Sequence, residues 1–276
     1  MPSDDLARIA WEEAPRLCQH DCQAYHRAWP LIRRLGLGAG PQGQGGFLRP
    51  AVADCLAGGG SDVLVSGAAD EALVRLVAEA AGRPPAITVL DRCATPLRLN
   101  REYARRAGLS LSTVRSDILD YLPGRRFDLI VTHSFLTSFA PASLTRLMGR
   151  WFELLRPGGR VVTVVRVRPD GAARRFTAEG AGRLAEEVQL RAPACPAAAA
   201  IPADGLADAV RRYATSRPGS HPFRTLEEVT RPFLVAGFGL REASLRDAIP
   251  RVRGIEGPGL ARDGSYACVI AARPTT

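Results

Sequence analysis

Lysine is missing from this sequence: all 37 basic residues among its 276 are arginine, and the formal net charge is +9. A basic excess of this size is typical of proteins that bind nucleic acid. The arginines are scattered as single residues and doublets, however, and form no long basic run. Together with the many alanine, glycine and proline residues, this pattern favours a bias in codon usage. Nucleic acid therefore stays an alternative partner and is not the favoured one.

Long apolar stretches are also missing. No run of about 18 or more apolar residues occurs, which excludes a helix that spans a membrane. The N-terminus, "MPSDDLARIAWEEAP", is acidic and lacks the apolar core of a signal peptide, so we expect a cytoplasmic protein. The six cysteines are spread along the chain, and in that compartment we expect them to be reduced thiols.

Short apolar runs alternate with helical patterns through the middle of the chain. Such strands, nearly continuous in apolar residues and separated by helices, are typical of a parallel sheet covered on both faces. Two closing segments, "GFGLREASL" and "GSYACVIAA", predict an antiparallel strand pair after a helix. The expected strands are residues 63–65, 86–90, 111–114, 127–132 and 160–167, and the expected helices are 71–81, 96–107, 141–155 and 226–236.

The N-terminal region has a different pattern. Apolar residues at helical spacing predict one helix over residues 4–36. A connection rich in glycine and proline follows at 36–46, and a second short helix is expected over 50–57. We therefore predict that residues 1–57 form a helical cap.

The remaining residues, 58–276, are predicted to form one α/β domain that is interrupted at about 168–222. This interruption contains two expected helices, at 178–190 and 205–215. Long connections in compact domains are either decoration or parts of functional sites. We favour a lid or substrate wall, with decoration as the alternative.

Four segments in register resemble the class I S-adenosylmethionine-dependent methyltransferases. They are "DVLVSGAADEA", "ITVLDRC", "VRSDILDYLPGRRFDLIVTHSFL" and "LLRPGGRVVTVV". The last is the most specific, because a helix, Leu-Arg-Pro-Gly-Gly and then a strand are very common before the fifth strand of that family. The resemblance implies a doubly wound, mostly parallel seven-stranded sheet with an antiparallel C-terminal pair, to which this chain adds its cap. It also implies methyl transfer with S-adenosylmethionine as the cofactor.

Acidic residues follow two of the expected strands. Ligands of open α/β sheets bind beyond the carboxyl ends of the strands. The resemblance places Asp91, with Arg92 beside it, at the ribose of the cofactor. It places Asp117 at the adenine amino group, with Ile118 packed on the ring. A cap or turn role is the alternative for Asp117.

The turn after the first expected strand has lost most of the family's glycines. The family pattern places an acidic residue at Val65 and glycines at Gly67, Ala69 and Glu71, and of these positions only Gly67 matches. Alanine costs little at such a position if its φ is negative. Asp70 is expected to cap the next helix, to pair with the ammonium of the methionine tail, or both. We predict an altered but retained cofactor site, with tail contacts from Gly67, Ala68, Ala69 and Asp70.

Residues for the reacting end come from two regions. His133 ends the fourth expected strand, where it can act as a general base or as a wall of the cofactor pocket. Tyr25 and His26 on the N-terminal helix are expected to line the same space, and a core-packing helix is the alternative.

The acceptor is expected to be a small molecule, and the chain lacks an "NPPY"-like motif that would indicate amino groups of nucleic acid or protein. An RNA or protein methyltransferase and a non-catalytic binding protein are the alternatives. The oligomeric state is left open.

Cys18, Cys22 and His26 recur at intervals of four residues. On one continuous helix, a rise of about 1.5 Å per residue would separate Cys18 from His26 by about 12 Å, too far to share an ion. Without distant ligands, we therefore expect no metal site.

Overall fold

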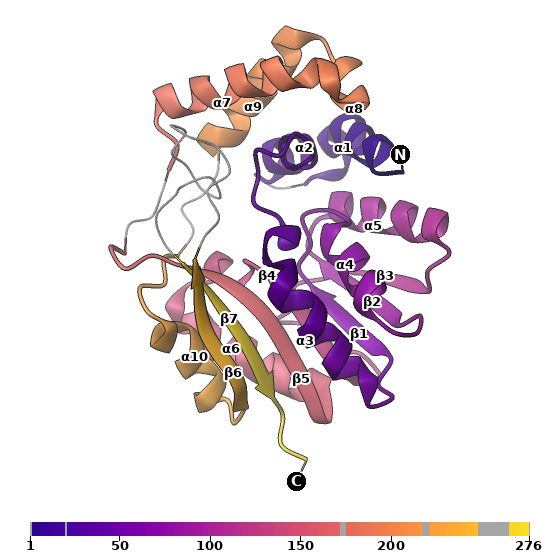
Figure 1. Ribbon diagram of the computed structural model, residues 1–276, viewed down its shortest axis with the longest axis vertical. Coiled ribbons are helices and arrows are strands. Elements are labelled where there is room, and N and C mark those ends of the chain that lie inside the picture. The colour runs from indigo at the N-terminus through magenta and orange to yellow at the C-terminus, as the bar shows by residue number, and fades with distance from the viewer. Residues whose placement is uncertain (1, 20, 172–174, 217–220, 248–264, 276) are drawn as a thin grey trace.

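The computed structural model describes residues 2–19, 21–171, 175–216, 221–247 and 265–275. A seven-stranded sheet with helices on both faces forms one part of the molecule, and a layer of helices lies beyond one end of the sheet (Figure 1). Among the described residues, none of the helices has the length and apolar content that a membrane span requires.

The sheet has the order β3-β2-β1-β4-β5-β7-β6. The first five strands pair in parallel, and β7 lies antiparallel between β5 and β6. The predicted doubly wound sheet with an antiparallel C-terminal pair is therefore confirmed. The strands are β1 (Asp62–Ser66), β2 (Ala86–Asp91), β3 (Leu111–Arg115), β4 (Phe127–His133), β5 (Leu155–Val167), β6 (Gly239–Asp247) and β7 (Ser265–Ala272).

Alternating side chains of the strands supply two cores. Val63 and Val65 pack in the cluster that contains apolar residues of α3, α4 and α5, whereas Leu64 packs in the cluster with α6 and α10. This division follows from the two-residue period of a strand. The helices are α3 (Gly45–Ala57), α4 (Ala72–Ala80), α5 (Ala94–Ala107), α6 (Pro141–Leu154) and α10 (Leu226–Val235). Although α3 falls inside the predicted cap of residues 1–57, it covers the sheet.

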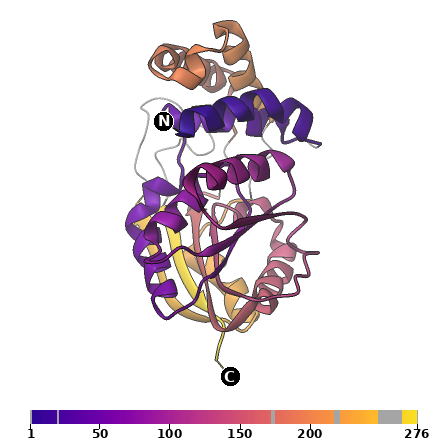
Figure 2. The same cartoon turned by 90° about the vertical axis from the view of Figure 1, so that its right-hand side faces the viewer.

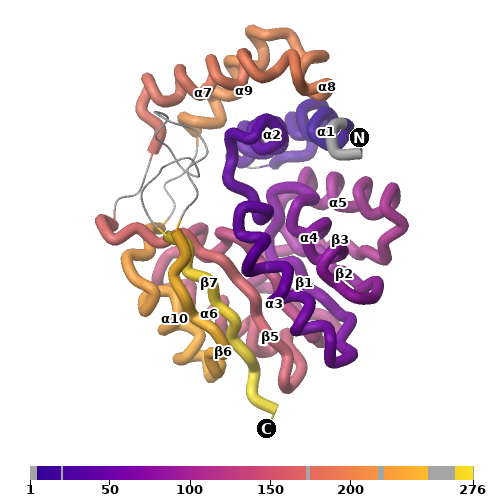
Figure 3. Tube along the Cα trace, viewed as in Figure 1, coloured from indigo at the N-terminus to yellow at the C-terminus, as the bar shows by residue number. Residues whose placement is uncertain are grey.

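The single helix expected over residues 4–36 is wrong. The chain forms α1 (Pro2–Leu17) and α2 (Gln23–Arg34), and it reverses direction between them. The apolar spacing is helical on both sides of the break, so the period of the pattern did not reveal the reversal. After α2 the chain runs to α3 beside the sheet (Figure 3).

The described helices of the segment 168–222 form the helical layer with α2. They are α7 (Ala178–Arg191), α8 (Pro196–Ala199) and α9 (Ala203–Ser216). Leu31 and Ile32 of α2 share a buried cluster with Leu184 and Val210. The layer therefore has its own core, separate from those of the sheet.

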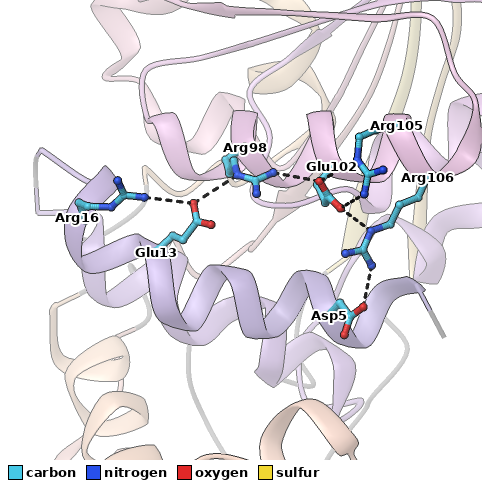
Figure 4. A network of polar contacts seen from close by, with 7 residues as sticks. All are labelled: Asp5, Glu13, Arg16, Arg98, Glu102, Arg105 and Arg106. Atoms are coloured by element: carbon cyan, nitrogen blue, oxygen red, sulfur yellow. Dashed lines mark hydrogen bonds and ion pairs between the residues drawn. The ribbon is translucent and has the colours of Figure 1, made fainter.

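The helical layer joins the sheet domain partly through α1, which lies along α5 (Figure 2). A small apolar cluster of Leu6, Ile9, Ala10 and Leu99 lies in this contact. Ion pairs connect the rims of the two helices, including Asp5 with Arg106 and Glu13 with Arg98, as Figure 4 shows. Partly exposed ion pairs of this kind contribute little to stability, on the order of 0–1 kcal/mol each.

Candidate active site

A cavity of about 480 Å³ lies between α2 and the carboxyl ends of the strands. This volume is within the range of small-molecule sites, roughly 300–1,000 Å³. Its position is also the one that ligands take in open α/β sheets. The lining includes Gly67, Asp91, His133, Arg166, Tyr25 and Trp29.

Asp91 ends β2 and faces the cavity. Its Oδ2 accepts a hydrogen bond from Ala68 N at 3.0 Å, and its Oδ1 accepts one from Cys93 N at 2.8 Å. Burial raises the pKa of Asp91, although these two bonds act in the opposite direction. Each carboxylate oxygen keeps capacity for a second donor, so Asp91 fits the two hydroxyls of a ribose.

The turn after β1 depends on its one remaining glycine. Gly67 has φ +76°, and a Cβ there would lie 2.3 Å from Phe135 Cδ2. Its amide donates to Leu90 O at 2.9 Å. Among the described residues the non-glycine with positive φ is Ser134, so Ala69 has the negative φ that an alanine accepts. Gly67, Ala68 and Ala69 all line the cavity, as predicted.

Asp70 performs the expected capping role. Its Oδ1 accepts from Ala72 N at 2.9 Å, and its Oδ2 lies 2.5 Å from Arg33 Nε. Arg33 Nη2 also donates to Glu71 Oε1 at 2.9 Å. Burial, together with the neighbouring Asp70, raises the pKa of Glu71. Both Asp70 oxygens thus hold the turn to α4 and α2, and the pairing of Asp70 with a cofactor ammonium stays a prediction.

The predicted adenine residues lie elsewhere. Neither Asp117 nor Ile118 lines this cavity, and the same is true of Arg92. Asp117 Oδ1 accepts from Leu119 N at 2.9 Å within its own turn, and its Oδ2 lies 3.7 Å from Arg92 Nε. Ile118 is buried in the core on the α6 side of the sheet. The structure thus shows the turn role of Asp117, and the adenine contact stays a prediction.

His133 at the end of β4 and Tyr25 on α2 both line the cavity. His133 Nε2 lies 2.9 Å from Gln44 Oε1. Donation from Nε2 to that oxygen leaves Nδ1 as the acceptor nitrogen of a neutral ring. Tyr25 stacks on Trp29, with ring centroids 5.7 Å apart, and on Tyr213 at 6.0 Å. This arrangement gives the cavity an aromatic wall, although whether His133 acts as a base stays a prediction.

Two arginines in the cavity were missed in the sequence. Arg166 and Arg168 are 8% and 6% exposed, and both line the cavity. Arg166 Nη1 donates to Tyr266 OH at 3.2 Å. The two arginines lie two residues apart at the end of an apolar strand, so their side chains point to the same side. This spacing could have identified them as cavity residues.

His26 is buried among cysteines. Its Nδ1 lies 3.6 Å from Cys18 Sγ, and it borders the cavity together with Cys22. Burial alone would lower the pKa of His26, but contacts with Cys22 and Cys93 raise it to about 9. The 12 Å separation expected for Cys18 and His26 on one helix is therefore wrong, because the chain reverses between them. His20 lies outside the described residues.

Similarity to known proteins agrees with this geometry. Residues 63–159 match the family model of the methyltransferase domain. No curated protein has significant sequence similarity to the chain. The apo structure of the S-adenosylmethionine-dependent methyltransferase SibL has a TM-score of 0.53 at 17% identity, over 99% of this chain and 70% of SibL.

Two further structures share the fold. The N-methyltransferase NodS from Bradyrhizobium japonicum WM9, in complex with S-adenosyl-L-homocysteine, has a TM-score of 0.51 at 15% identity, over 96% of this chain and 99% of NodS. The pyocyanin biosynthetic protein PhzM has a TM-score of 0.51 at 17% identity, over 96% of this chain and 61% of PhzM. Residues 63–159 thus match a methyltransferase domain, and the chain has the fold of S-adenosylmethionine-dependent methyltransferases. The predicted family, the enzyme class and S-adenosylmethionine as cofactor are confirmed.

Proposed function

We propose that the protein transfers a methyl group to a small-molecule acceptor. The observation that carries this proposal is the cavity of about 480 Å³ at the strand ends, which α2 covers. It joins the carboxylate of Asp91 to an aromatic wall that contains Tyr25 and Trp29. A cavity of this size suits a small ligand better than a duplex or a folded protein.

The side chains of the cavity also support a class of acceptor. Tyr25 and Trp29 line the cavity with flat apolar faces, and the buried guanidinium groups of Arg166 and Arg168 give its lining positive charge. Guanidinium groups bind carboxylates through paired, charge-assisted hydrogen bonds. An aromatic or similarly planar molecule with an acidic group matches both features.

The chain's own residues have separate tasks in this proposal. S-adenosylmethionine supplies the activated methyl group when bound. Asp91 holds the ribose, and the aromatic wall aligns the acceptor, since alignment is the main requirement of a displacement reaction. His133, which lines the cavity, accepts the proton of an acceptor hydroxyl or amine.

Calorimetry with S-adenosyl-L-homocysteine tests the cofactor site. The wild type should bind, and Asp91→Ala should bind at least tenfold more weakly, on the order of 1.4 kcal/mol or more. Asp208→Ala is the control, because Asp208 is an exposed acid on α9 that does not line the cavity. Absence of binding to the wild type would support a non-catalytic protein, and wild-type affinity in Asp91→Ala would refute the ribose assignment.

A panel of matched acceptors tests the substrate class. Aromatic carboxylic acids and their amides should be compared by release of S-adenosyl-L-homocysteine, with the acids preferred. Arg166→Met should raise KM for an acid acceptor and leave affinity for S-adenosyl-L-homocysteine unchanged, with exposed Arg241→Met as the control. Methylation of RNA, with affinity that falls steeply with salt, would instead support the nucleic-acid alternative.

A further inference from the structure

We propose that Cys18, Cys22, His26 and Cys93 bind a structural zinc ion that fastens the helical layer to the sheet domain. Their sulfur and ring nitrogen atoms all lie within 4.8 Å of one another. Three cysteines and one histidine are a common ligand set of structural zinc sites. The four residues come from α2 and from two junctions that lie far apart in the sequence.

The distances fit tetrahedral coordination. Bond lengths of about 2.3 Å for Zn–S and about 2.0–2.1 Å for Zn–N place two sulfurs about 3.8 Å apart, and a sulfur and a nitrogen about 3.6 Å apart. Cys18 Sγ lies 3.4 Å from Cys93 Sγ and 3.6 Å from His26 Nδ1. All four donor atoms lie within 4.8 Å of one another. The most distant pair therefore has to approach by about 1 Å to reach the separation of a tetrahedral site.

The backbone around the cluster favours thiolates. Cys22 precedes α2 and Cys93 precedes α5 at the N-cap positions, and neither side chain caps its helix. The positive end of a helix dipole stabilises an anionic sulfur. Thr95 Oγ1 lies 3.2 Å from Cys18 Sγ, where its hydroxyl can donate to a bound thiolate.

A disulfide between Cys18 and Cys93 is the main rival reading of this cluster. It would use two of the four groups and leave Cys22 and His26 with no role in the cluster. All four donor atoms converge, however, and His26 is buried against Cys18. Zinc binding uses all four groups, and each bound cysteine that starts as a thiol releases one proton.

The position of the cluster explains what such an ion would do. The contact of α1 with α5 contains a small apolar cluster and partly exposed ion pairs. A metal joined to Cys18, His26 and Cys93 ties the end of α1 and the start of α2 to the loop after β2. Cys93 N also donates to Asp91, so the ion would hold the cofactor loop at the same time.

Metal analysis of the full chain provides the test. Protein purified under reducing conditions from zinc-supplemented medium should retain about one zinc ion per chain after dialysis. Cys18→Ser, Cys22→Ser and Cys93→Ser should each lose it. Cys55→Ser is the matched control, since Cys55 is a half-buried thiol on α3 outside the cluster, and it should keep the zinc.

Two further measurements keep the proposal testable if the serine variants do not fold. Titration of the wild-type protein with a mercurial reagent should release the zinc in step with modification of the thiols. His26→Cys should retain metal, because four cysteines also bind zinc, and cobalt substituted into it should show stronger thiolate charge-transfer bands than cobalt in the wild type.

Three results would contradict a zinc site at this cluster. Wild-type protein that contains no zinc and gives no thiolate charge-transfer band on titration with cobalt would overturn the proposal. So would a Cys18–Cys93 disulfide in protein prepared anaerobically, or zinc content unchanged in Cys93→Ser. None of these measurements depends on methyl transfer, so the zinc site and the proposed function can fail separately.

Discussion

Phe135 lies across Gly67, so closely that a Cβ on this glycine would be 2.3 Å from Phe135 Cδ2. Gly67 also has a positive φ of 76°. Gly67→Ala should therefore destabilise the protein by about 2 kcal/mol or more, from backbone strain together with the clash. Urea unfolding measures the loss, and calorimetry should show weakened binding of S-adenosyl-L-homocysteine.

A matched control for this prediction is Gly182→Ala. Gly182 lies within α7, where an added Cβ meets no atom within 4 Å. That substitution should stabilise the protein by about 0.5–1 kcal/mol, because alanine favours a helix. Equal effects of the two substitutions would contradict the geometric argument.

Arg33 pairs with two buried carboxylates. Its side chain is 10% exposed, and those of Asp70 and Glu71 are 4% and 2% exposed. Arg33→Met should cost about 3–5 kcal/mol of unfolding free energy, because removal of one partner leaves buried charge without compensation. Arg49→Met, which breaks the exposed pair with Glu79, should cost less than about 1 kcal/mol in the same experiment.

Asp128 predicts a specific pH dependence. Burial alone would raise its pKa, but hydrogen bonds from Arg156 and from the amides of Asp62 and Ser61 outweigh burial and lower it. Its contribution to stability is thus fully present above the unfolded pKa, about 3.9, and is lost as pH falls through the folded value. Asp128→Asn should cost on the order of 1 kcal/mol at pH 7, after allowance for solvent screening.

Urea unfolding of wild type and Asp128→Asn between pH 7 and pH 3 measures this effect. The difference should be constant from pH 7 to about pH 5 and should narrow below about pH 4. Asp120→Asn is the control, because Asp120 is 70% exposed in its pair with Arg146, and it should show little difference throughout. A difference in unfolding free energy between the two proteins that increased toward low pH would contradict this prediction.

Ser134 follows His133 with φ +53°, a conformation that glycine adopts at lower cost. Ser134→Gly should stabilise the protein by up to about 1 kcal/mol, whereas Ser134→Val should destabilise it, since a β-branched residue tolerates this region poorly. Thermal unfolding separates the two variants. If Ser134→Gly destabilised the protein, the serine side chain would contribute more to the free energy of unfolding than its positive φ costs.

The sheet could be predicted because local signals determine it. Apolar runs such as 127–132 and 160–167 lie within β4 and β5, and "RPGG" precedes the long apolar part of β5. The ribose role of Asp91 came from the family resemblance and stays a prediction, whereas its place beside the cavity follows from its position at a strand end. These inferences require only neighbouring residues and the general behaviour of parallel sheets.

The position of α2 beside the cavity could not be predicted in the same way. The reversal between Cys18 and Cys22 carries neither glycine nor proline, so the helical spacing concealed it. Arg33 meets Asp70, and Cys18 meets Cys93, across sequence separations of 37 and 75 residues. Such contacts depend on how α2 packs on the sheet domain, which a single sequence does not specify.

The ion pairs of Arg33 have a consequence for how this protein can change over time. In the proposed function α2 lines the acceptor space, and its Arg33 is bound directly to the turn that would hold the methionine tail. A substitution that reshapes α2 for a new acceptor therefore also moves groups beside the methyl donor. Under the proposed function, adaptation to another substrate should therefore proceed through other walls of the cavity, such as the end of β5.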